Sequence, residues 1–354
     1  WISDGTTSGT IILKDINPGI NGSHPIDFFI FNDHVFFIAN DGSNHLELWK
    51  SDGTSSGTSL LKNINVSGHG LTQGNNFIVF NNHFYFFAQE NFNGSELWKS
   101  DGTTAGTLLL KDLIPGLGSS SNTILGAATD DYFVFAALSP SHIGYELWKS
   151  DGTESGTVFL KDIHPSESGL QPYETKFITH NDKIYFVANN GSNGEELWKT
   201  DGTEAGTVLV KDIRSGSLGS NPQSLTNVNG VLYFVAEDGV NGYEVWKSNG
   251  TAAGTVMVKD IRASIGGYVP YLLTNVNGTL FFTADDGVNG LELWKSDGTA
   301  AGTVMVKDIV SGASSGFPRL FTNVNGTLFF VADTGTNGEE LWKSDGTTAG
   351  TMMV

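Results

Sequence analysis

The sequence predicts an all-β propeller built from four-stranded blades. A tryptophan-containing motif recurs along the chain, with successive tryptophans 48, 49, 50, 50, 48, 48 and 48 residues apart. Repeats of this length are typical of arrays of one supersecondary unit. Each repeat holds four short apolar runs separated by turn residues, as expected for a four-stranded blade. The tryptophans that mark the repeats are Trp1, Trp49, Trp98, Trp148, Trp198, Trp246, Trp294 and Trp342.

The repeat that ends at residue 261 shows the expected strands most clearly, at 225–228, 231–236, 244–248 and 256–261. Asn229-Gly230 lies between the first two runs and predicts a type I′ hairpin, because both central residues of that turn need positive φ. The same turn is expected at the matching positions Asn32-Asp33, Asn81-Asn82, Asp130-Asp131, Asn181-Asp182, Asn277-Gly278 and Asn325-Gly326.

An Asp-Gly-Thr turn joins the third and fourth strands. Its aspartate is expected to accept hydrogen bonds from backbone N–H groups two or three residues later. Asn249 replaces the aspartate in one repeat and can do the same, which favours a structural role over a metal-binding or catalytic one. The turn aspartates are Asp4, Asp52, Asp101, Asp151, Asp201, Asp297 and Asp345.

Apolar residues occupy both faces of the second strand, as in Phe281-Phe282 and Phe329-Phe330. A sheet buried on both faces needs a neighbour above and below, which radial stacking of blades provides. Most of the tryptophans lie mid-strand beside leucine or valine. We therefore expect them in the core between blades rather than in sugar-binding sites.

The number of blades follows from counting hairpins. The chain holds 8 copies of the outer hairpin (third and fourth strands) and 7 of the inner hairpin (first and second strands). Seven complete blades fit either residues 1–341, with a last blade that combines both chain ends, or residues 17–354. An eight-bladed ring is the alternative. We expect one propeller domain over residues 1–354, and, since the sequence starts and stops inside the motif, a fragment of a longer repeat array.

The composition limits the partners. With 38 acidic and 19 basic residues, the formal charge is −19, which disfavours nucleic acid and anionic membranes and favours cationic partners or divalent metal ions. No apolar run approaches the ~18 residues of a membrane span, so no membrane insertion is expected. There is no cysteine, so disulfides play no part.

The run Glu-Leu-Trp-Lys-Ser-Asp-Gly-Thr begins at Glu47, Glu96, Glu146, Glu292 and Glu340. It resembles the ELWxxDGT-type repeats of large bacterial surface and secreted proteins. The Ser-Asp-Gly-Thr turn also resembles the Asp-box of sialidase-type propellers, although here the tryptophan precedes the aspartate. The resemblance implies a β-propeller at the bacterial cell exterior and implies little about activity.

A glutamate precedes every tryptophan but the first by two positions. We expect these glutamates to pair across the outer hairpin with lysines such as Lys62, Lys111 and Lys259. Their repetition in each blade argues against general acid–base catalysis, which needs carboxylates in different environments. The glutamates are Glu47, Glu96, Glu146, Glu196, Glu244, Glu292 and Glu340.

Acidic loops between the second and third strands could supply oxygen ligands to calcium. Their spacing does not reproduce a twelve-residue calcium loop, and solvated turns explain the same pattern. Calcium therefore stands as an alternative, and no other cofactor is expected. The candidate ligands are Asp41, Asp238, Asp285, Asp286 and Asp333.

The segments that cross from one repeat to the next vary most in sequence, and loops on one rim of a scaffold usually carry specificity. Aromatic residues there are candidates for glycan binding: Tyr173, Tyr268, Tyr271 and Phe317. The divergent loop at 138–143, with His142, is a further candidate. We expect a noncatalytic extracellular or cell-surface module that serves adhesion, binding of a glycan or protein, or scaffolding.

Two other functions remain open. The surplus outer hairpin suggests self-assembly by exchange of a blade or hairpin. A sialidase-like glycoside hydrolase would need unique arginines that converge on one site, but Arg214 and Arg262 occupy the same repeat position. That pattern points to repeat duplication rather than to an anion clamp.

Overall fold

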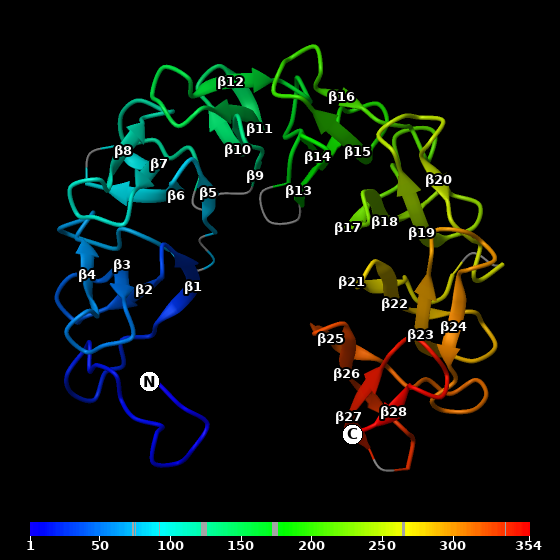
Figure 1. Ribbon diagram of the computed structural model, residues 1–354. Helices are drawn as coiled ribbons and strands as arrows, with labels where there is room; N and C mark the ends of the chain where they lie inside the picture. Colours follow the sequence, from blue (N-terminus) through cyan, green and yellow to red (C-terminus); the bar gives the residue numbers. More distant parts are fainter. Residues whose placement is uncertain are drawn as a thin grey trace. The chain divides into compact units, whose positions relative to one another are not determined.

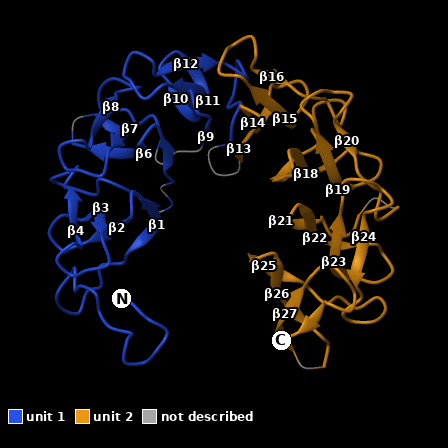
Figure 2. Ribbon diagram, in the orientation of Figure 1, with its two compact units in different colours: residues 1–175 blue, residues 176–354 orange. Residues whose placement is uncertain are grey.

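The computed structural model describes residues 1–72, 74, 76–91, 93–121, 126–171, 176–263, 266–336 and 338–354. In these residues all regular secondary structure is β, and it forms seven four-stranded antiparallel sheets (Figure 1). Each sheet consists of four consecutive strands. The expected all-β fold of seven four-stranded propeller blades is therefore confirmed. The chain divides into two compact units, residues 1–175 and 176–354 (Figure 2).

Unit 1 contains three sheets. The first comprises β1 (Ile26–Phe31), β2 (His34–Asn40), β3 (Leu46–Ser51) and β4 (Ser59–Lys62). The second comprises β5 (Ile78–Phe80), β6 (His83–Glu90), β7 (Gly94–Ser100) and β8 (Leu108–Lys111). The third comprises β9 (Gly126–Ala128), β10 (Phe133–Ser139), β11 (His142–Ser150) and β12 (Val158–Lys161).

Unit 2 contains four sheets. The first two comprise β13 (Phe177–His180), β14 (Lys183–Asn189), β15 (Glu195–Thr200) and β16 (Val208–Leu209), then β17 (Gln223–Val228), β18 (Val231–Glu237), β19 (Tyr243–Ser248) and β20 (Val256–Met257). The last two comprise β21 (Tyr271–Val276), β22 (Thr279–Asp285), β23 (Leu291–Ser296) and β24 (Val304–Lys307), then β25 (Arg319–Val324), β26 (Thr327–Asp333), β27 (Glu339–Ser344) and β28 (Met352–Met353).

The fourth strand is shorter than the sequence predicts. β20 ends at Met257 rather than at residue 261. The N–H of Val258 still donates to the carbonyl oxygen of Val245 at 2.8 Å. Beyond that bond the chain leaves the sheet, and the N–H of Arg262 donates to a carboxylate oxygen of Glu244 at 3.1 Å. The side-chain carboxylate of Glu244, on the third strand, thus accepts a backbone hydrogen bond where the hydrogen bonding between the third and fourth strands has ended.

The inner hairpins confirm the type I′ prediction at six of the seven positions. At Asn229-Gly230, for example, φ is 49° and 74°. The prediction is wrong at Asp130-Asp131, where neither residue has positive φ. There the N–H of Thr129 donates to the carbonyl oxygen of Tyr132 at 2.8 Å, and the Thr129 hydroxyl accepts from the N–H of Asp131 at 3.3 Å. The threonine side chain closes a different turn.

The Asp-Gly-Thr turns form as predicted. Oδ1 of Asp52 accepts hydrogen bonds from the N–H of Thr54 at 2.8 Å and from its hydroxyl at 2.7 Å. Asn249 makes the same two bonds to Thr251, at 3.0 Å and 2.8 Å. The role of these residues in closing the turn is therefore confirmed.

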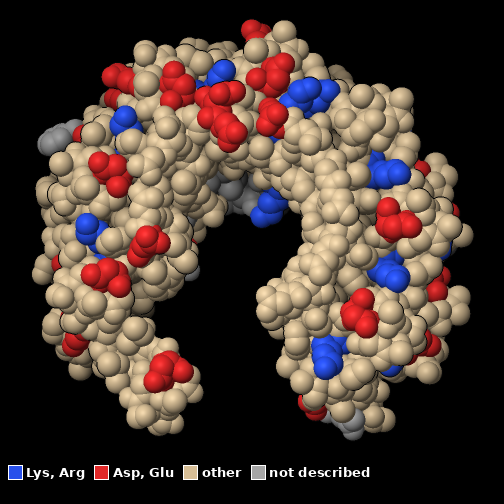
Figure 3. All heavy atoms as spheres, in the orientation of Figure 1, with Lys and Arg blue, Asp and Glu red and all other residues tan. Residues whose placement is uncertain are grey.

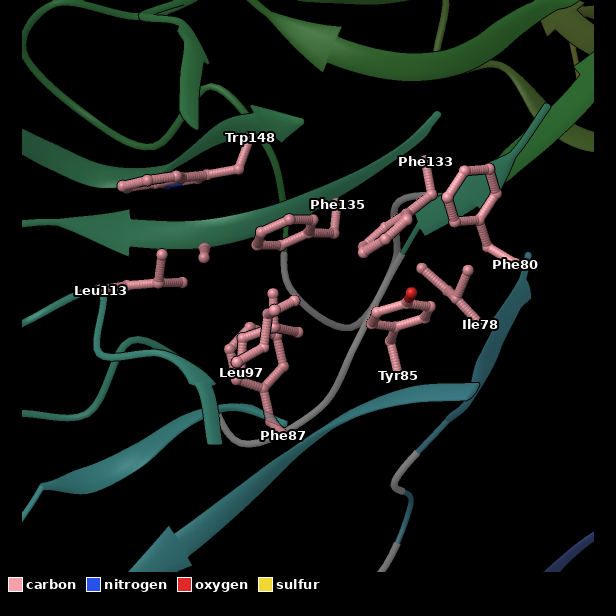
Figure 4. Close-up of a cluster of buried hydrophobic side chains, with 11 residues drawn as sticks. Ile78, Phe80, Tyr85, Phe87, Leu97, Leu113, Phe133, Phe135 and Trp148 are labelled. Carbon is pink, nitrogen blue, oxygen red and sulfur yellow. The ribbon is translucent and has the colours of Figure 1, made fainter. Parts of the chain in front are cut away.

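Apolar side chains fill the space between adjacent sheets. Seven of the eight tryptophans are 4–6% exposed, whereas Trp1 is 79% exposed. The expectation that the tryptophans belong to the core holds for all but the first. Figure 4 shows one such cluster, in which the second and third sheets of unit 1 contribute Tyr85, Phe87, Leu97, Phe133, Phe135 and Trp148.

On the face shown in Figure 3, acidic and basic side chains are interspersed over both units. Among the described residues, no helix is long and apolar enough to cross a membrane.

A candidate ligand pocket beside Glu244

Buried glutamates hold the segments that cross from one sheet to the next. Oε2 of Glu292, on β23, accepts the N–H of Ile309 at 3.0 Å, and Oε1 accepts the N–H of Gly316 at 2.8 Å. Backbone N–H groups are bound in the same way by Glu47, Glu96, Glu146, Glu196 and Glu244. Glu340 has the same repeat position but is exposed. In the segments held by Glu146 and Glu292, the carboxylate thus fixes both ends of a variable loop.

The predicted pairing of these glutamates with fourth-strand lysines is wrong. The lysines instead reach the neighbouring sheet. Nζ of Lys259 donates to the carbonyl oxygen of Thr303 at 2.8 Å and lies 5.8 Å from the centre of the Trp294 ring. Lys62 and Lys111 bind the carbonyl oxygens of Thr107 and Thr157 in the same manner. A backbone carbonyl on the next sheet therefore takes the place of the expected carboxylate.

Burial controls the protonation of the six buried glutamates. Each loses its contact with water, and this raises the pKa of each carboxyl group to about 7 even though backbone N–H donors oppose the change. The exposed turn aspartates behave in the opposite way. Hydrogen bonds from Thr299, for instance, lower the pKa of Asp297.

Glu244 differs from its counterparts in the same unit. Ser220 donates through its hydroxyl to Oε2 of Glu196 at 2.5 Å, and Gly316 donates to Glu292. Glu244 is 2% exposed, yet its Oε2 accepts no hydrogen bond from the described residues. A buried acceptor without a donor costs about 1–3 kcal/mol. Oε2 of Glu244 is therefore an acceptor that no donor among the described residues uses.

The sequence of the crossing segment explains the missing donor. Tyr268 stands where the neighbouring repeats have Ser220 and Gly316, two residues before the proline. In those repeats the next residue, Asn221 or Phe317, has a left-handed φ of 47°. The matching residue here is Val269, which does not adopt positive φ. A β-branched side chain strongly disfavours that region, so this crossing follows a different path.

A pocket of about 290 Å³ lies at this point, between the loops of the second and third sheets of unit 2. Glu244 and Tyr268 line it, and the Tyr268 side chain is 57% exposed. The ion pair between Arg262 and Asp285 forms part of its wall. The pocket thus combines an unused carboxylate oxygen, an accessible aromatic ring and a neutralised pair of charges.

The structure brings two of the predicted site residues together in this pocket, Tyr268 and Asp285. Tyr271 is half-buried at the start of β21, and burial raises the pKa of its hydroxyl group. Phe317 is exposed on the next crossing segment. His142 belongs to unit 1, where its ring stacks on Phe159 with centroids 4.0 Å apart. Tyr173 lies outside the described residues.

The predicted calcium ligands serve mainly to close their own loops. Oδ1 of Asp238 accepts the N–H groups of Val240 at 2.9 Å and Asn241 at 2.8 Å, while Oδ2 accepts the Asn241 side-chain amide at 2.7 Å. Asp41 and Asp286 make matching bonds. Asp285 and Asp333 bind backbone N–H groups of Gly287 and Gly335.

In the part of the chain that the structure describes, no three histidine, aspartate or glutamate side chains gather in a position to hold a metal ion.

Sequence reasoning did not single out Glu244, because it treated the glutamates as equivalent. The available signal was the Tyr268-Val269 pair, which replaces smaller or more permissive residues of the neighbouring crossing segments. A change in the residues that donate hydrogen bonds to the repeated glutamate distinguishes this repeat from the others.

No known protein family matches the sequence, and no curated protein does. Solved structures with a similar fold include a puromycin hydrolase mutant complexed with PGG, at 12% identity and a TM-score of 0.44, with 94% of this chain and 53% of that chain covered. A prolyl endopeptidase structure has 12% identity and a TM-score of 0.48, with 93% and 49% covered. The chain therefore spans about half the length of these proteins. The likeness concerns fold and carries no activity to this chain.

Proposed function

We propose that this chain is a noncatalytic, extracellular propeller module that binds a hydroxyl-rich ligand such as a glycan in the pocket beside Glu244, in adhesion or ligand recognition. The observation that carries the proposal is the buried Oε2 of Glu244, which accepts no hydrogen bond from the described residues although Glu244 lines a pocket. This oxygen is closed to solvent in the structure, so a sugar hydroxyl reaches it only when a lining side chain moves; the hydroxyl would then supply the missing donor and remove the cost of the unpaired oxygen.

The rest of the pocket suits a polar, uncharged ligand. The exposed ring of Tyr268 offers an apolar face to the flat side of a sugar ring. Arg262 and Asp285 already neutralise each other, so this ion pair offers a charged ligand no unbalanced partner. Small sets of convergent polar groups beside an aromatic surface are typical of ligand pockets.

The noncatalytic assignment is supported by the repeated use of the glutamates and arginines. Arg214 and Arg262 form ion pairs with Glu237 and Asp285 at equivalent repeat positions. These contacts fasten the loops and do not form an anion clamp. Turnover of a chromogenic sialoside or another glycoside by the purified chain would contradict the noncatalytic assignment. The extracellular assignment rests on the resemblance to bacterial surface repeats and on the acidic composition.

A glycan array tests the proposal, run with calcium and with a chelator. We expect binding in both conditions, with loss of signal in Tyr268→Ala and retention in Phe317→Ala, which removes another exposed aromatic residue of a crossing segment. Binding only with calcium would bring the acidic loops back as metal sites. Equal binding by both variants would exclude the pocket as the site, and silence of the wild-type chain would count against glycan binding.

A further inference from the structure

The carboxylate of Glu244 lacks a positively charged partner. Four charged side chains line the pocket: Glu237, Glu244, Arg262 and Asp285. Glu237 pairs with Arg214, and Asp285 pairs with Arg262. None of the ion pairs among the described residues includes Glu244. The charge left unbalanced among the lining side chains is therefore negative and belongs to Glu244.

Two further carboxylates increase the negative potential at Glu244. Burial raises the pKa of Glu244 to about 7, against the effect of hydrogen bonds from backbone N–H groups. The negative charges of Asp260 and Asp238 raise this pKa further. Opposite charges attract strongly where water is excluded, so a cation that enters this space stabilises the buried carboxylate. A group that brings both a hydrogen-bond donor and a positive charge therefore suits Oε2 better than a neutral hydroxyl does.

The hydrogen bonds around the pocket favour the same kind of group. Two donors that line the pocket are engaged with carboxylates: Nδ2 of Asn241 donates to Oδ2 of Asp238 at 2.7 Å, and the Arg262 guanidinium donates to Asp285. Among the buried glutamates of the described chain, Glu244 alone has a carboxylate oxygen that accepts no hydrogen bond. An ammonium group donates three hydrogen bonds and accepts none, whereas a hydroxyl donates one.

We propose that the ligand of this pocket is a saccharide with a free primary amine, whose ammonium group binds Oε2 of Glu244. The inference rests on the proposed function and narrows its ligand class, because the rest of the saccharide remains uncharged and rich in hydroxyl groups. As for a hydroxyl, the amino group reaches this oxygen only when a lining side chain moves. The volume of about 290 Å³ is at the lower limit for small-molecule sites, which suits a single amino sugar residue.

A metal ion is the other cation that could approach Glu244. Calcium takes roughly six to eight oxygen ligands. Within the described ranges, no three histidine, aspartate or glutamate side chains gather in a position to hold a metal ion. Both carboxylate oxygens of Asp238 accept hydrogen bonds from their own loop. An ammonium group needs fewer protein ligands and is therefore the cation that fits.

The glycan array gives the first readout. We expect its strongest ligand to carry a free amino group. A strongest ligand without one would overturn the inference and leave the proposed function standing, whereas a silent array would overturn both.

Three matched trisaccharides give a sharper test that needs no protein variant. The β-1,4-linked trimers of glucosamine, N-acetylglucosamine and glucose share one backbone and carry an amine, an acetamide or a hydroxyl at the same carbon. Calorimetric titration at neutral pH should show at least tenfold tighter binding of the glucosamine trimer, because its hydrogen bond to the carboxylate is charge-assisted. Equal binding of the three trimers, or binding of none, would overturn the inference.

A matched pair of variants shows whether Glu244 recognises the amine. Glu244→Gln should abolish the preference and bring the three affinities within about threefold of one another. Glu292→Gln should retain the preference, because backbone N–H groups already occupy both oxygens of Glu292. A preference that persists in Glu244→Gln, or that both variants lose equally, would overturn the inference.

The net charge of −19 requires a control for attraction of any cation to the acidic surface. Trilysine serves as that control and should bind at least tenfold more weakly than the glucosamine trimer, because it offers the pocket no sugar ring. Equal binding of trilysine would show that the chain responds to positive charge alone and would overturn the inference.

Discussion

Gly316 donates a 2.8 Å hydrogen bond to Glu292, and Tyr268 stands at the matching position after Glu244, where Oε2 of the glutamate accepts no hydrogen bond from the described residues. In both sites the glutamate holds the same repeat position on the third strand, and the crossing segment has the same length. The sites differ in the two residues before the proline. Glu292 only anchors its crossing segment, whereas Glu244 is also the candidate ligand-binding residue.

The anchoring role predicts a large loss of stability in Glu292→Ala. The change leaves the N–H groups of Ile309 and Gly316 without their acceptor in a buried position, at a cost of about 2–4 kcal/mol in the free energy of unfolding. Chemical denaturation measures it. Glu340→Ala is the matched control, because Glu340 is exposed at the same repeat position. A similar loss in both variants would contradict the anchoring role.

The six raised pKa values predict that stability falls as pH rises. Between pH 4.5 and about 7 the folded state binds more protons at these groups than the unfolded state, so the free energy of unfolding decreases through that window. We expect a lower melting temperature at pH 8 than at pH 5.5. The net charge of −19 acts in the same direction, so a variant must separate the two effects. Glu292→Gln removes one of the six groups with a raised pKa and should reduce the slope.

The Asp-Gly-Thr turn leaves no room for a side chain at its closing glycine. A Cβ atom on Gly302 would lie 2.1 Å from Cγ of Asp297. Gly302→Ala should therefore lower the free energy of unfolding by about 2 kcal/mol or more. The loss should be clearly smaller in an Asp297→Ala background. Asp297→Asn should be nearly neutral, since Asn249 makes the same hydrogen bonds. Equal cost of Gly302→Ala in both backgrounds would show that the aspartate is not the obstacle.

The lysine contacts between sheets predict a modest cost for Lys259→Met. The variant loses the hydrogen bond to Thr303 and the contact with the Trp294 ring, together about 1–2 kcal/mol. Denaturation of the double variant with Glu244→Gln should give additive effects within about 0.5 kcal/mol. A larger coupling would revive the direct pairing of Lys259 with Glu244 that the structure does not show.

Much of the fold could be predicted because each local sequence signal recurs in several repeats. Asn-Gly and Asn-Asp pairs predict the inner hairpins, and the spacing of the tryptophans predicts the blades. Asp130-Asp131 failed because the neighbouring Thr129 provides a competing side-chain acceptor, a contact that turn propensity ignores.

The site was harder to predict for a related reason. Pairing by strand register placed Glu244 opposite Lys259, but the chain turns away after Met257 and brings backbone N–H groups to the carboxylate instead. The missing donor at Glu244 depends on the path of one crossing segment, which comes from Val269 and its neighbours. Tyr268 could be identified from the sequence as a variable aromatic residue, whereas Glu244, which lines the same pocket, could not be distinguished from the other glutamates of the repeat.

The most direct test of the central claim is calorimetric titration of the strongest array glycan into Glu244→Gln and Glu292→Gln, at a temperature where both variants are folded. The account predicts at least tenfold weaker binding for Glu244→Gln, because the ligand hydroxyl loses its carboxylate acceptor, and wild-type affinity for Glu292→Gln. Equal affinities for the two variants would contradict the assignment of Glu244 as the ligand-binding residue.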